Sequence, residues 1–447
     1  MSSLQIGVTG FALLGVMIYA GIHISTSLLT VAFLGVWAVR GDISIAGNML
    51  AIAATDSVTE YEFGTVPLFV LMGFLVMVAG VGADSYAVAH RLLRKVPGGL
   101  GHATVVGNAI FSAITGVTVA AVVLFTRLAV PEMLKRGYNA RLAVGVVAGS
   151  AMLGMLIPPS VLMIIYAVLT EISIGDIYNA GIVPGIILAG AFSLAIYVIA
   201  FLRPEWVGRG TATGNLTEAE MANVEDESRS LVSQAAPIVI LVLIVLGGMY
   251  GGLFTATEAG AVGAAGALII ALWRRSLDLR TFWSVLIDTG YVTASLILII
   301  ASATMFSRFL ALSGVPAFLG NWVQHMQLGL YSVMLVYVLI VLVLGTALDS
   351  TSTILISVPI FAPIFQQLGG DLIWVGIITM IAVEVGLITP PLGMSPFIVK
   401  ASLINDPLGR KISLNDIYVG SLPFAGAAIA VIALLIAFPV LTKVFIK

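Results

Sequence analysis

The sequence predicts an all-α membrane protein that crosses the bilayer many times and consists of two related halves. Of the 447 residues, 60% are hydrophobic and only 9% are charged. Soluble domains carry about 25% charged residues, so a water-soluble protein of this size could not cover its surface with so few charges. Long apolar stretches recur along the chain, and one set of short motifs occurs twice in the same order. These three observations together predict the fold class.

The composition also argues against several functional classes. A net charge of −2 gives no reason to expect a nucleic-acid partner. The absence of cysteine excludes disulfides, thiolate metal sites and cysteine nucleophiles. The histidines (His23, His90, His102 and His325) lack metal-ligand spacing, and no Walker A, HExxH or GxSxG string is present. We therefore expect a carrier without a cofactor and not an enzyme, and we keep an intramembrane enzyme and a channel as the alternatives.

The apolar stretches set the expected number of membrane crossings. A helix needs about 20 apolar residues to cross a hydrocarbon core of about 30 Å. Segments 160–170 and 393–404 are too short to cross alone, and each follows a Pro-Pro pair, so we expect each to continue the preceding stretch as a broken helix. Segments 103–126 and 350–366 could be re-entrant hairpins, which leaves about eleven full crossings and two hairpins. The fifteen stretches are 4–21, 24–39, 64–83, 103–126, 140–157, 160–170, 180–202, 231–249, 253–273, 283–306, 331–347, 350–366, 373–388, 393–404 and 418–442.

One polar stretch, from Arg203 to Arg229, separates the two halves. It is rich in acidic residues, and Thr217 with Glu220 has capping-box spacing, so a short surface helix could begin there. We interpret the stretch as a solvated connector. The predicted division is residues 1–60 as N-terminal scaffold helices, 61–202 as a first repeat, 203–230 as the connector, 231–282 as scaffold or arm helices and 283–447 as a second repeat.

An internal duplication is the most informative feature. GMLIPPS begins at Gly154 and GLITPPLG at Gly386, so Pro158 and Pro390 are related by an offset of 232 (390 − 158). The same offset relates Pro131 to Pro363 and Gly82 to Gly314. A Ser-x-x-Asp-Ile-Tyr motif begins at Ser173 and again at Ser413, an offset of 240 (413 − 173). Repeats of this kind build secondary transporters, in which a shared site lies near the midplane of the membrane.

The Pro-Pro pairs indicate where ions bind. Each pair removes two N–H donors and interrupts the helical hydrogen bonds, which frees carbonyl groups inside the protein. Ser160 follows Pro158–Pro159, and Thr389 precedes Pro390–Pro391. Carbonyl and hydroxyl oxygens are suitable ligands for a hard cation such as Na⁺. The competing interpretation is a pair of simple proline kinks.

A second pair of polar strings precedes the Pro-Pro pair in each repeat. SAITGVT runs from Ser112 to Thr118, and GTALDSTST runs from Gly345 to Thr353. Both combine glycine and hydroxyls with a break in an apolar run, which suits the tip of a hairpin where helix N-termini present N–H groups to an anion. Hydroxyls that simply pack between helices are the alternative for each residue.

Charged residues inside apolar runs are costly, so each is a candidate for the transport pathway or for an ion pair. We rank Asp349 first because it lies within the second hairpin motif. We expect Glu384 to orient the second broken helix, and Arg127 and Arg308 to lie at the membrane interface. Glu258 is the remaining candidate.

These motifs resemble the large membrane subunit of the tripartite ATP-independent periplasmic (TRAP) transporters over most of the chain. The strongest stretch runs from Val130 to Gly185, joined by FTATEAGAVGAAGAL from Phe254, LDSTSTILISVPIFAPI from Leu348 and VGLITPPLG from Val385. The resemblance implies two inverted repeats with hairpins, an elevator mechanism, Na⁺ coupling and an organic acid substrate. It also implies a small four-helix membrane subunit and a periplasmic binding protein as partners, in the bacterial inner membrane.

The resemblance places the family's ion sites on the two hairpin tips and the two Pro-Pro loops. We predict that the ion is bound by Thr115, Gly116, Thr118, Pro158, Ser160, Gly345, Thr346, Asp349, Ser350, Thr389 and Pro390. We predict that the substrate is bound by Ser112, Thr118, Pro159, Ser160, Ser350, Thr351, Pro391 and Gly393.

Two positions depart from the family pattern. Where family members often carry Gly-Ser-Ser, this chain has Gly116–Val117–Thr118, which removes one hydroxyl from the first hairpin tip. Where many carry Pro-Thr-Glu-Ala, this chain has alanine at residue 256. The first departure indicates an altered ion site or a different substrate subgroup.

Overall fold

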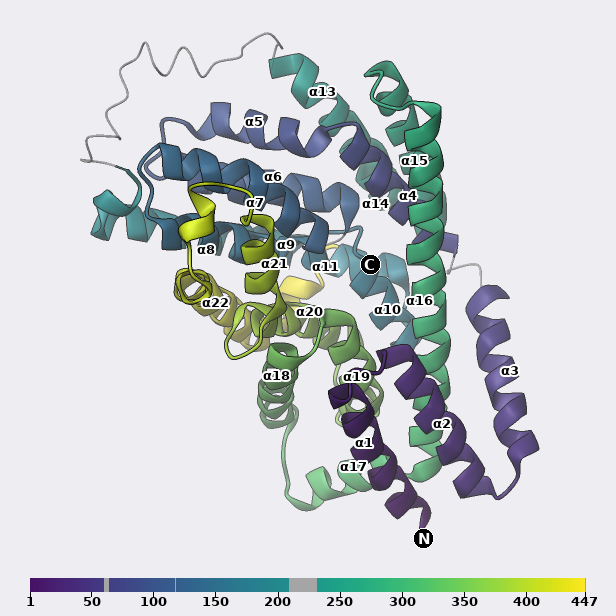
Figure 1. The fold of residues 1–447 in the computed structure, drawn as a ribbon. Coiled ribbons are helices and arrows are strands. Elements are labelled where there is room, and N and C mark those ends of the chain that lie inside the picture. The colour runs from purple at the N-terminus through teal and green to yellow at the C-terminus, as the bar shows by residue number, and fades with distance from the viewer. Residues whose placement is uncertain (60–63, 117, 209–230, 447) are drawn as a thin grey trace.

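The computed structural model is helical throughout the residues that it describes, which are 1–59, 64–116, 118–208 and 231–446. Three N-terminal helices lie against one long helix, and the remaining helices form a second body beside them (Figure 1). The helices of the first half are α1 Ser3–Tyr19, α2 Ile24–Arg40, α3 Ile43–Thr59, α4 Thr65–Val78, α5 Val81–Leu93, α6 Gly99–Thr115, α7 Thr118–Lys135, α8 Ala140–Ser150, α9 Leu153–Leu156, α10 Val161–Thr170, α11 Ile174–Leu202 and the 3₁₀ turn η2 Pro204–Trp206.

The second half follows the connector and repeats most of this order. Its helices are α13 Leu231–Val242, the π-helical turn η3 Leu243–Gly247, α14 Gly248–Tyr250, α15 Ala256–Trp273, α16 Leu279–Ser313, α17 Val315–His325, α18 Leu330–Ala347, α19 Ser350–Gln367, α20 Leu372–Ile388, α21 Met394–Ser402, η4 Gly409–Lys411, α22 Leu414–Ala437 and η5 Pro439–Thr442.

The helices of the two halves share the register of the sequence duplication. Helices α7 and α19 begin and end at the same offset of 232 (350 − 118 and 367 − 135), and so do the α8–α9 pair and α20. Helices α11 and α22 each begin after a capping serine, Ser173 and Ser413, at the offset of 240. The repeat therefore extends from short motifs to whole helices, because the residues that start and stop each helix were duplicated with it.

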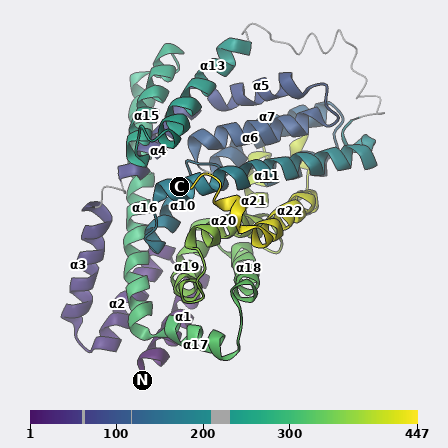
Figure 2. The same cartoon turned by 180° about the vertical axis from the view of Figure 1, so that it is seen from behind.

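Helices α5 and α17 hold equivalent places in the two halves, and they lie at opposite ends of the molecule (Figures 1 and 2). Each follows a glycine with positive φ: Gly80 at 73° and Gly314 at 74°. Glycine adopts this left-handed conformation without the clash that a Cβ would cause. At Gly80 the chain bends by 66° between α4 and α5, so α5 leaves the direction of the preceding span.

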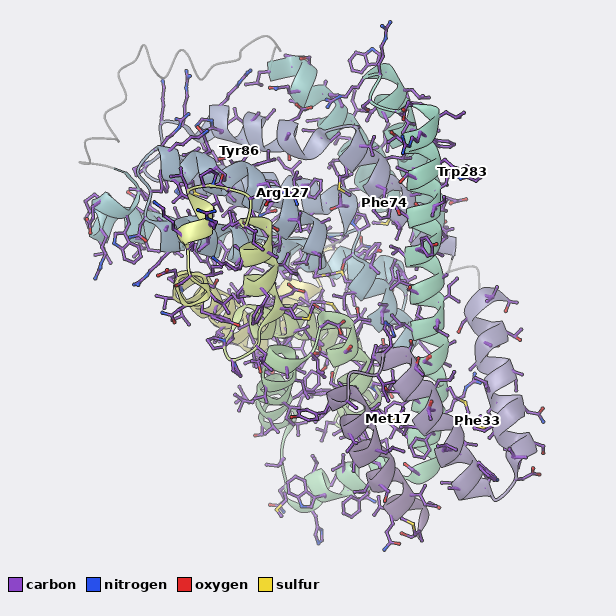
Figure 3. All side chains as sticks on the ribbon, viewed as in Figure 1. Met17, Phe33, Phe74, Tyr86, Arg127 and Trp283 are labelled. Carbon is purple, nitrogen blue, oxygen red and sulfur yellow. The ribbon has the colours of Figure 1, made fainter. Side chains whose placement is uncertain are left out.

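The long helix α16 packs against all three N-terminal helices. Its 35 residues span about 52 Å at 1.5 Å per residue, more than the hydrocarbon thickness. Phe309 of α16 sits in a groove between α1 and α2, where a Cβ on Gly10 or Gly35 would collide with its ring. Trp283, near the other end of α16, projects away from the rest of the protein (Figure 3). We call α1–α3 and α16, together with α15, which packs on α4 beside α16, the scaffold.

The two halves meet where α8 crosses α22. A Cβ on Gly145 would overlap the carbonyl oxygen of Gly420, and a Cβ on Gly420 would overlap that of Arg141. Small residues at such a crossing let helix backbones approach closely, which is how helices associate in lipid. The contact joins one helix of each repeat into a single core.

Three expectations about the elements need correction. Segment 350–366 is not a hairpin by itself, because it forms one continuous helix, α19, with Pro359 and Pro363 inside it. The hairpin of the second half is α18 with α19, and that of the first half is α6 with α7, so both have longer arms than expected. The apolar stretches also missed α3, α5 and α17, since these helices carry several polar residues.

Length and composition of the helices allow a comparison with the eleven membrane crossings expected from the sequence. Among the described residues, six helices are long and apolar enough to cross a membrane alone, and up to eight when bent pairs are counted as one span. Three more apolar helices (α1, α2 and α20) fall short of 18 residues. These three have 17 residues each, and with them the described helices that could cross number eleven (8 + 3), as the sequence predicted. The Thr217–Glu220 capping box lies outside the described residues.

Candidate functional site

The tip of the first hairpin lies directly on the first Pro-Pro loop. Helix α6 ends at Thr115, and Gly116 follows with φ of 64°, donating its N–H to the carbonyl of Ser112 at 2.9 Å. A Cβ on Gly116 would collide with the carbonyl oxygen of Pro159. Gly116 is therefore required both by its backbone conformation and by the closeness of this loop.

Two buried hydroxyls of this hairpin converge on the first broken helix. A Cβ built on Gly154 would lie 3.1 Å from Ser112 Oγ and 3.4 Å from Thr118 Oγ1. Ser112 is 0% and Thr118 3% exposed, and neither hydroxyl has a hydrogen-bond partner within the described part of the chain. Buried polar groups normally have hydrogen-bond partners. These two unpaired hydroxyl oxygens are therefore suited to coordinate a bound cation. Val117 lies outside the described residues.

The polar character of this region extends one turn back along α6. Asn108, four residues before Ser112, donates from Nδ2 to Ser150 Oγ at 2.6 Å, and its Oδ1 is buried without a partner among the described residues. The sequence analysis missed Asn108, although a polar residue one turn from Ser112 in an apolar run was the available signal.

The first Pro-Pro loop separates α9 from α10 and is buried. Pro158, Pro159 and Ser160 are all inaccessible, and the bend between the two helix segments is 44°. Ser160 caps α10, since its Oγ accepts the N–H of Met163 at 3.4 Å. Within the described chain, no backbone N–H bonds the carbonyls of residues 157–159. The carbonyls are therefore free of helical hydrogen bonds, as expected for a Pro-Pro break.

The tip of the second hairpin is built around a helix cap. Helix α18 ends at Ala347, and Asp349 caps α19 by accepting the N–H groups of Thr351 at 3.0 Å and Ser352 at 3.2 Å. Its other carboxylate oxygen accepts the hydroxyl of Ser352. Both oxygens of the first-ranked charged candidate thus already accept hydrogen bonds from its own helix.

Glu384, and not Asp349, is the buried acidic residue of the second site. It is 1% exposed on α20, and its Oε1 accepts the hydroxyl of Ser350 at 2.9 Å. Its Oε2 is buried with no partner among the described residues, and no ion pair to Glu384 is found there. The expectation that Glu384 orients the second broken helix agrees with this contact, which ties α20 to the hairpin tip.

Glycines bring the second hairpin against the second broken helix as well. A Cβ on Gly345 would lie 2.9 Å from the carbonyl of Val383, and Gly345 and Gly386 face each other. Thr346 is half-buried and donates its hydroxyl to Val343 O at 2.8 Å, leaving its oxygen lone pairs free.

The second Pro-Pro loop differs from the first because it is accessible. Pro390 and Pro391 are exposed, whereas their counterparts are buried. Thr389 Oγ1 donates to Val385 O at 2.6 Å, and a Cβ on Gly393 would lie 2.5 Å from Leu387 O and 2.8 Å from Thr389 O. The loop thus folds back on its own carbonyls around Gly393.

The two half-sites are interleaved. Helix α21, which follows the second Pro-Pro loop, packs against α7 of the first hairpin, and α10, which follows the first loop, packs against α19 of the second hairpin. The predicted residues therefore gather into two related clusters, each bounded by helices of both repeats.

Other charged candidates lie outside these clusters. Glu258, left open between the transport pathway and an ion pair, is exposed and closes a capping box with Thr255 at the start of α15. Arg308 pairs with Asp56 of α3 at 2.9 Å, and Arg127 is exposed on α7 (Figure 3). No group of three or more His, Cys, Asp or Glu side chains that could hold a metal occurs among the described residues.

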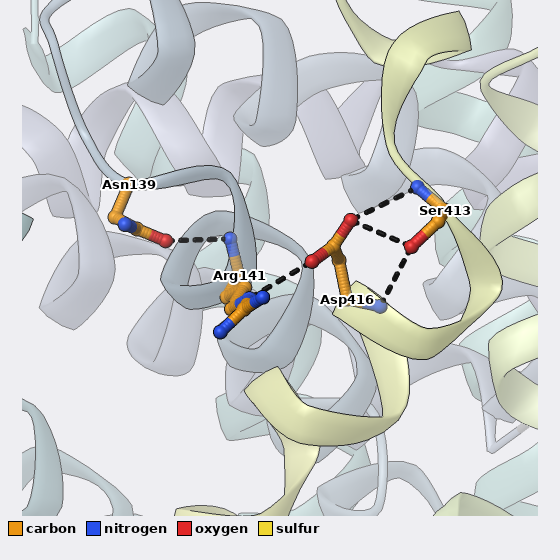
Figure 4. Close-up of polar contacts among 4 residues, drawn as sticks. All are labelled: Asn139, Arg141, Ser413 and Asp416. Carbon is orange, nitrogen blue, oxygen red and sulfur yellow. Dashed lines mark hydrogen bonds and ion pairs between the residues drawn. The ribbon is translucent and has the colours of Figure 1, made fainter.

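The Asp-Ile-Tyr motif has a structural role at the repeat contact. In the second repeat, Ser413 and Asp416 form a capping box, and Asp416 Oδ1 pairs with Arg141 Nε at 2.8 Å (Figure 4). Asn139 caps α8 beside this pair by accepting the N–H of Arg141 at 2.9 Å. The pair is half-exposed, so it contributes little free energy, about 0–1 kcal/mol.

Comparisons with known proteins agree with this architecture. Residues 11–441 match the family model described as the tripartite ATP-independent periplasmic transporter, DctM component. The C4-dicarboxylate TRAP transporter large permease protein DctM of Pseudomonas aeruginosa is 33% identical over 364 residues, which cover 81% of this chain and 82% of that protein. The sialic acid TRAP transporter large permease protein SiaM of Vibrio cholerae is 29% identical, with 95% of each chain covered.

A solved structure extends the agreement to the fold. The crystal structure of the Alcanivorax borkumensis YdaH transporter superposes with a TM-score of 0.57 at 15% identity, over 88% of this chain and 89% of that one. Both named relatives are transporter permeases and not enzymes, which removes the enzymatic alternative. The chain is a multi-pass membrane protein that belongs to the tripartite ATP-independent periplasmic transporter family, as its DctM component.

Proposed function

We propose that this chain is the permease of a Na⁺-driven importer of small organic anions. The observation that carries the proposal is the contact of each hairpin with the broken helix of its own repeat, with the unpaired hydroxyls of Ser112 and Thr118 at the first. Interrupted helices with free carbonyls and hydroxyls are how secondary transporters bind cations near the membrane midplane.

The atoms that could coordinate a cation in the two clusters are oxygens. In the first, these are the hydroxyls of Thr115 and Thr118 and the carbonyls around Gly116, Pro158 and Ser160. In the second, they are the groups around Gly345, Thr346, Thr389 and Pro390, with Asp349 and Ser350 at the hairpin tip. Hard monovalent and divalent cations prefer such oxygen ligands, and a single Na⁺ that moves down 100 mV releases about 2.3 kcal/mol.

Four helices begin at these clusters: α7 and α10 from the first repeat and α19 and α21 from the second. Helix N-termini carry partial positive charge and unpaired N–H groups, so they favour an anion. The predicted substrate residues lie at or beside these N-termini, namely Ser112, Thr118, Pro159, Ser160, Ser350, Thr351, Pro391 and Gly393. The names of the two relatives, which specify a dicarboxylate and sialic acid, support a carboxylate-bearing substrate.

The arrangement of the helices supports alternating access by an elevator movement. Helices α1–α3, α15 and α16 would stay in place as the scaffold, while the two interleaved half-sites would move together as one unit. The unequal accessibility of the two Pro-Pro loops supports this idea, since one face of the site is open while the other is buried. Inverted repeats would relate the two accessible states by a pseudo-two-fold axis in the plane of the membrane.

We further propose two partners and a location. The family description as a tripartite transporter supports a small four-helix membrane subunit and a periplasmic binding protein, which would deliver the substrate. The bacterial inner membrane is the location in which such a complex would operate.

Reconstitution tests the proposal. The chain, with its small subunit, is placed in proteoliposomes, and uptake of the ligand of the cognate binding protein is measured with and without an inward Na⁺ gradient. Saturable uptake that needs both Na⁺ and the binding protein is expected. Uptake that ignores Na⁺, or an unsaturated conductance typical of a channel, would contradict the proposal.

A matched pair of variants tests the role of the breaks. Replacing Pro159 or Pro391 by alanine restores an N–H group next to each break, so we expect lost uptake with normal membrane insertion. Normal uptake in both variants would refute the broken-helix role.

A further inference from the structure

Two tyrosines, one on α11 and one on α22, donate hydrogen bonds to carbonyls of the Pro-Pro loops. Tyr178 and Tyr418 end the Asp-Ile-Tyr motif of each repeat, at the offset of 240 (418 − 178). Tyr178 OH donates to the carbonyl of Ser160 at 3.3 Å. Tyr418 OH donates to the carbonyl of Pro391 at 3.3 Å, and Gly393 O lies 3.5 Å away. Ser160 corresponds to residue 392 under the 232 offset, so the second tyrosine contacts the carbonyls on either side of the equivalent position.

The rest of the motif fixes where each tyrosine lies. Ser173 caps α11 and Ser413 caps α22, which places both tyrosines in the second turn of their helices. Tyr178 is 0% exposed, and its ring meets the edge of Phe69 from α4 at 6.3 Å. Tyr418 is 9% exposed. Neither ring is free to move away from its loop without repacking.

The face of α11 that carries Tyr178 also contacts the residues just before the first Pro-Pro pair. One turn beyond Tyr178, a Cβ on Gly181 would lie 2.6 Å from the carbonyl of Leu156. One turn further, a Cβ on Gly185 would lie 2.9 Å from the side chain of Ile157. Helix α11 is therefore a close-fitting wall behind the first break, and the tyrosine hydroxyl is its polar contact.

We propose that Tyr178 and Tyr418 are positioning residues: each binds one carbonyl on the far side of its Pro-Pro loop and so holds the loop with its remaining carbonyls available to the coupling ion. Two successive prolines provide no N–H groups at the break, so few backbone hydrogen bonds hold the loop there. The Ser160 carbonyl also accepts the N–H of Ile164 at 3.2 Å, so Tyr178 adds a second hydrogen bond where the first loop joins α10. Among the described residues, the two tyrosines supply the side-chain hydrogen bonds that reach the loop carbonyls. The inference rests on the proposed Na⁺ site, and it assigns a role to the motif that the ion and substrate residues leave unexplained.

The test measures Na⁺ binding directly and needs no substrate. The full-length chain in detergent is unfolded thermally across a series of NaCl concentrations, with choline chloride keeping the ionic strength constant. A ligand that binds the folded state raises the unfolding temperature with its concentration, so the half-saturating Na⁺ concentration can be read from the series. Tyr178→Phe and Tyr418→Phe remove one hydroxyl each.

A matched control separates positioning from general stability. Tyr166 is also 0% exposed, and its hydroxyl donates to a backbone carbonyl, that of Leu372, at 2.7 Å, away from the Pro-Pro loops. Tyr166→Phe should lower the unfolding temperature without Na⁺ at least as much as the other two variants, because it removes the shorter hydrogen bond. It should leave the half-saturating Na⁺ concentration unchanged.

We expect Tyr178→Phe and Tyr418→Phe each to raise the half-saturating Na⁺ concentration about two- to tenfold, the loss of one hydrogen bond. If Tyr178→Phe does not fold, Tyr418→Phe at the more accessible loop decides the question. The inference is overturned if the unsubstituted chain responds to Na⁺ and both variants keep its half-saturating concentration. If the unsubstituted chain shows no response to Na⁺, the proposed coupling fails together with it.

Discussion

The hydroxyl of Ser350 donates a 2.9 Å hydrogen bond to the buried carboxylate of Glu384, and this contact ties the second hairpin to the second broken helix. The equivalent positions in the first repeat are Thr118 and Met152. The Thr118 hydroxyl has no partner in the described part of the chain. The two half-sites therefore share a backbone plan but differ by one buried carboxyl group.

This difference predicts an effect of Glu384→Gln. The amide keeps an acceptor for Ser350 but removes a carboxyl group that, once ionised, would attract a cation in a low-dielectric site. We expect the Na⁺ concentration for half-maximal uptake to rise about tenfold, the scale of one hydrogen bond to a charged group. Glu384→Met, which copies the first repeat, should also leave Ser350 unpaired and lower the unfolding temperature further. An unaltered Na⁺ dependence in Glu384→Gln would show that the charge does not serve the ion.

A second prediction concerns the unpaired hydroxyl of Thr118. Because this hydroxyl bonds no described residue, Thr118→Ala removes no hydrogen bond within that part of the protein. We expect the half-maximal Na⁺ concentration to rise about fivefold, the equivalent of about 1 kcal/mol. Ser350→Ala should act in the same direction.

Thr126→Ala is the matched control for Thr118→Ala. Thr126 lies on the same helix, is 0% exposed, and likewise has no partner among the described residues for its hydroxyl. It lies eight residues further along α7, away from the hairpin tip. Equal effects of the two substitutions on Na⁺ dependence would remove the hairpin-tip assignment.

A third prediction separates backbone conformation from contact at Gly116. Gly116→Ala costs about 1–2 kcal/mol from the left-handed conformation, and the new Cβ also collides with Pro159. Gly369 has a similar φ of 72° with nothing within 4 Å of a Cβ. Gly369→Ala should therefore lose a similar free energy of unfolding to the part of the Gly116→Ala loss that comes from the left-handed conformation. Only Gly116→Ala should abolish uptake. Retained uptake in that variant would mean that the tip need not rest on the loop.

A fourth prediction tests the contact between the repeats. Gly145→Ala places a methyl group into the carbonyl of Gly420, so α8 and α22 must separate. We expect a loss of about 1–3 kcal/mol of stability, typical of overpacking. Gly190→Ala, on α11 with nothing within 4 Å, should be neutral or stabilising, because alanine favours helix over glycine by about 1 kcal/mol. Equal unfolding temperatures for the two variants would contradict the close crossing.

The sequence was sufficient for everything that depends on local signals. The Pro-Pro pairs interrupt helices locally and the Ser-x-x-Asp-Ile-Tyr motif marks a helix start, so their duplication predicted the repeat register and both broken helices. The low charge content alone required a membrane environment. Where helices carry polar residues, as α3 does, the same apolar count failed, and segment 350–366, expected as a possible hairpin, is one continuous helix.

Only the tertiary structure decided which groups face one another. Ser350 and Glu384 are 34 residues apart, Tyr178 and Ser160 are 18 apart, and each pair is joined by helix packing that no local pattern encodes. The closeness of Gly154 to Ser112 and Thr118, and the unequal exposure of the two Pro-Pro loops, depend in the same way on how α6, α7 and α9 pack. Helix boundaries follow from short-range sterics and hydrogen bonding, whereas the site depends on the packing of distant helices, so the sequence predicted its parts and the fold determined their arrangement.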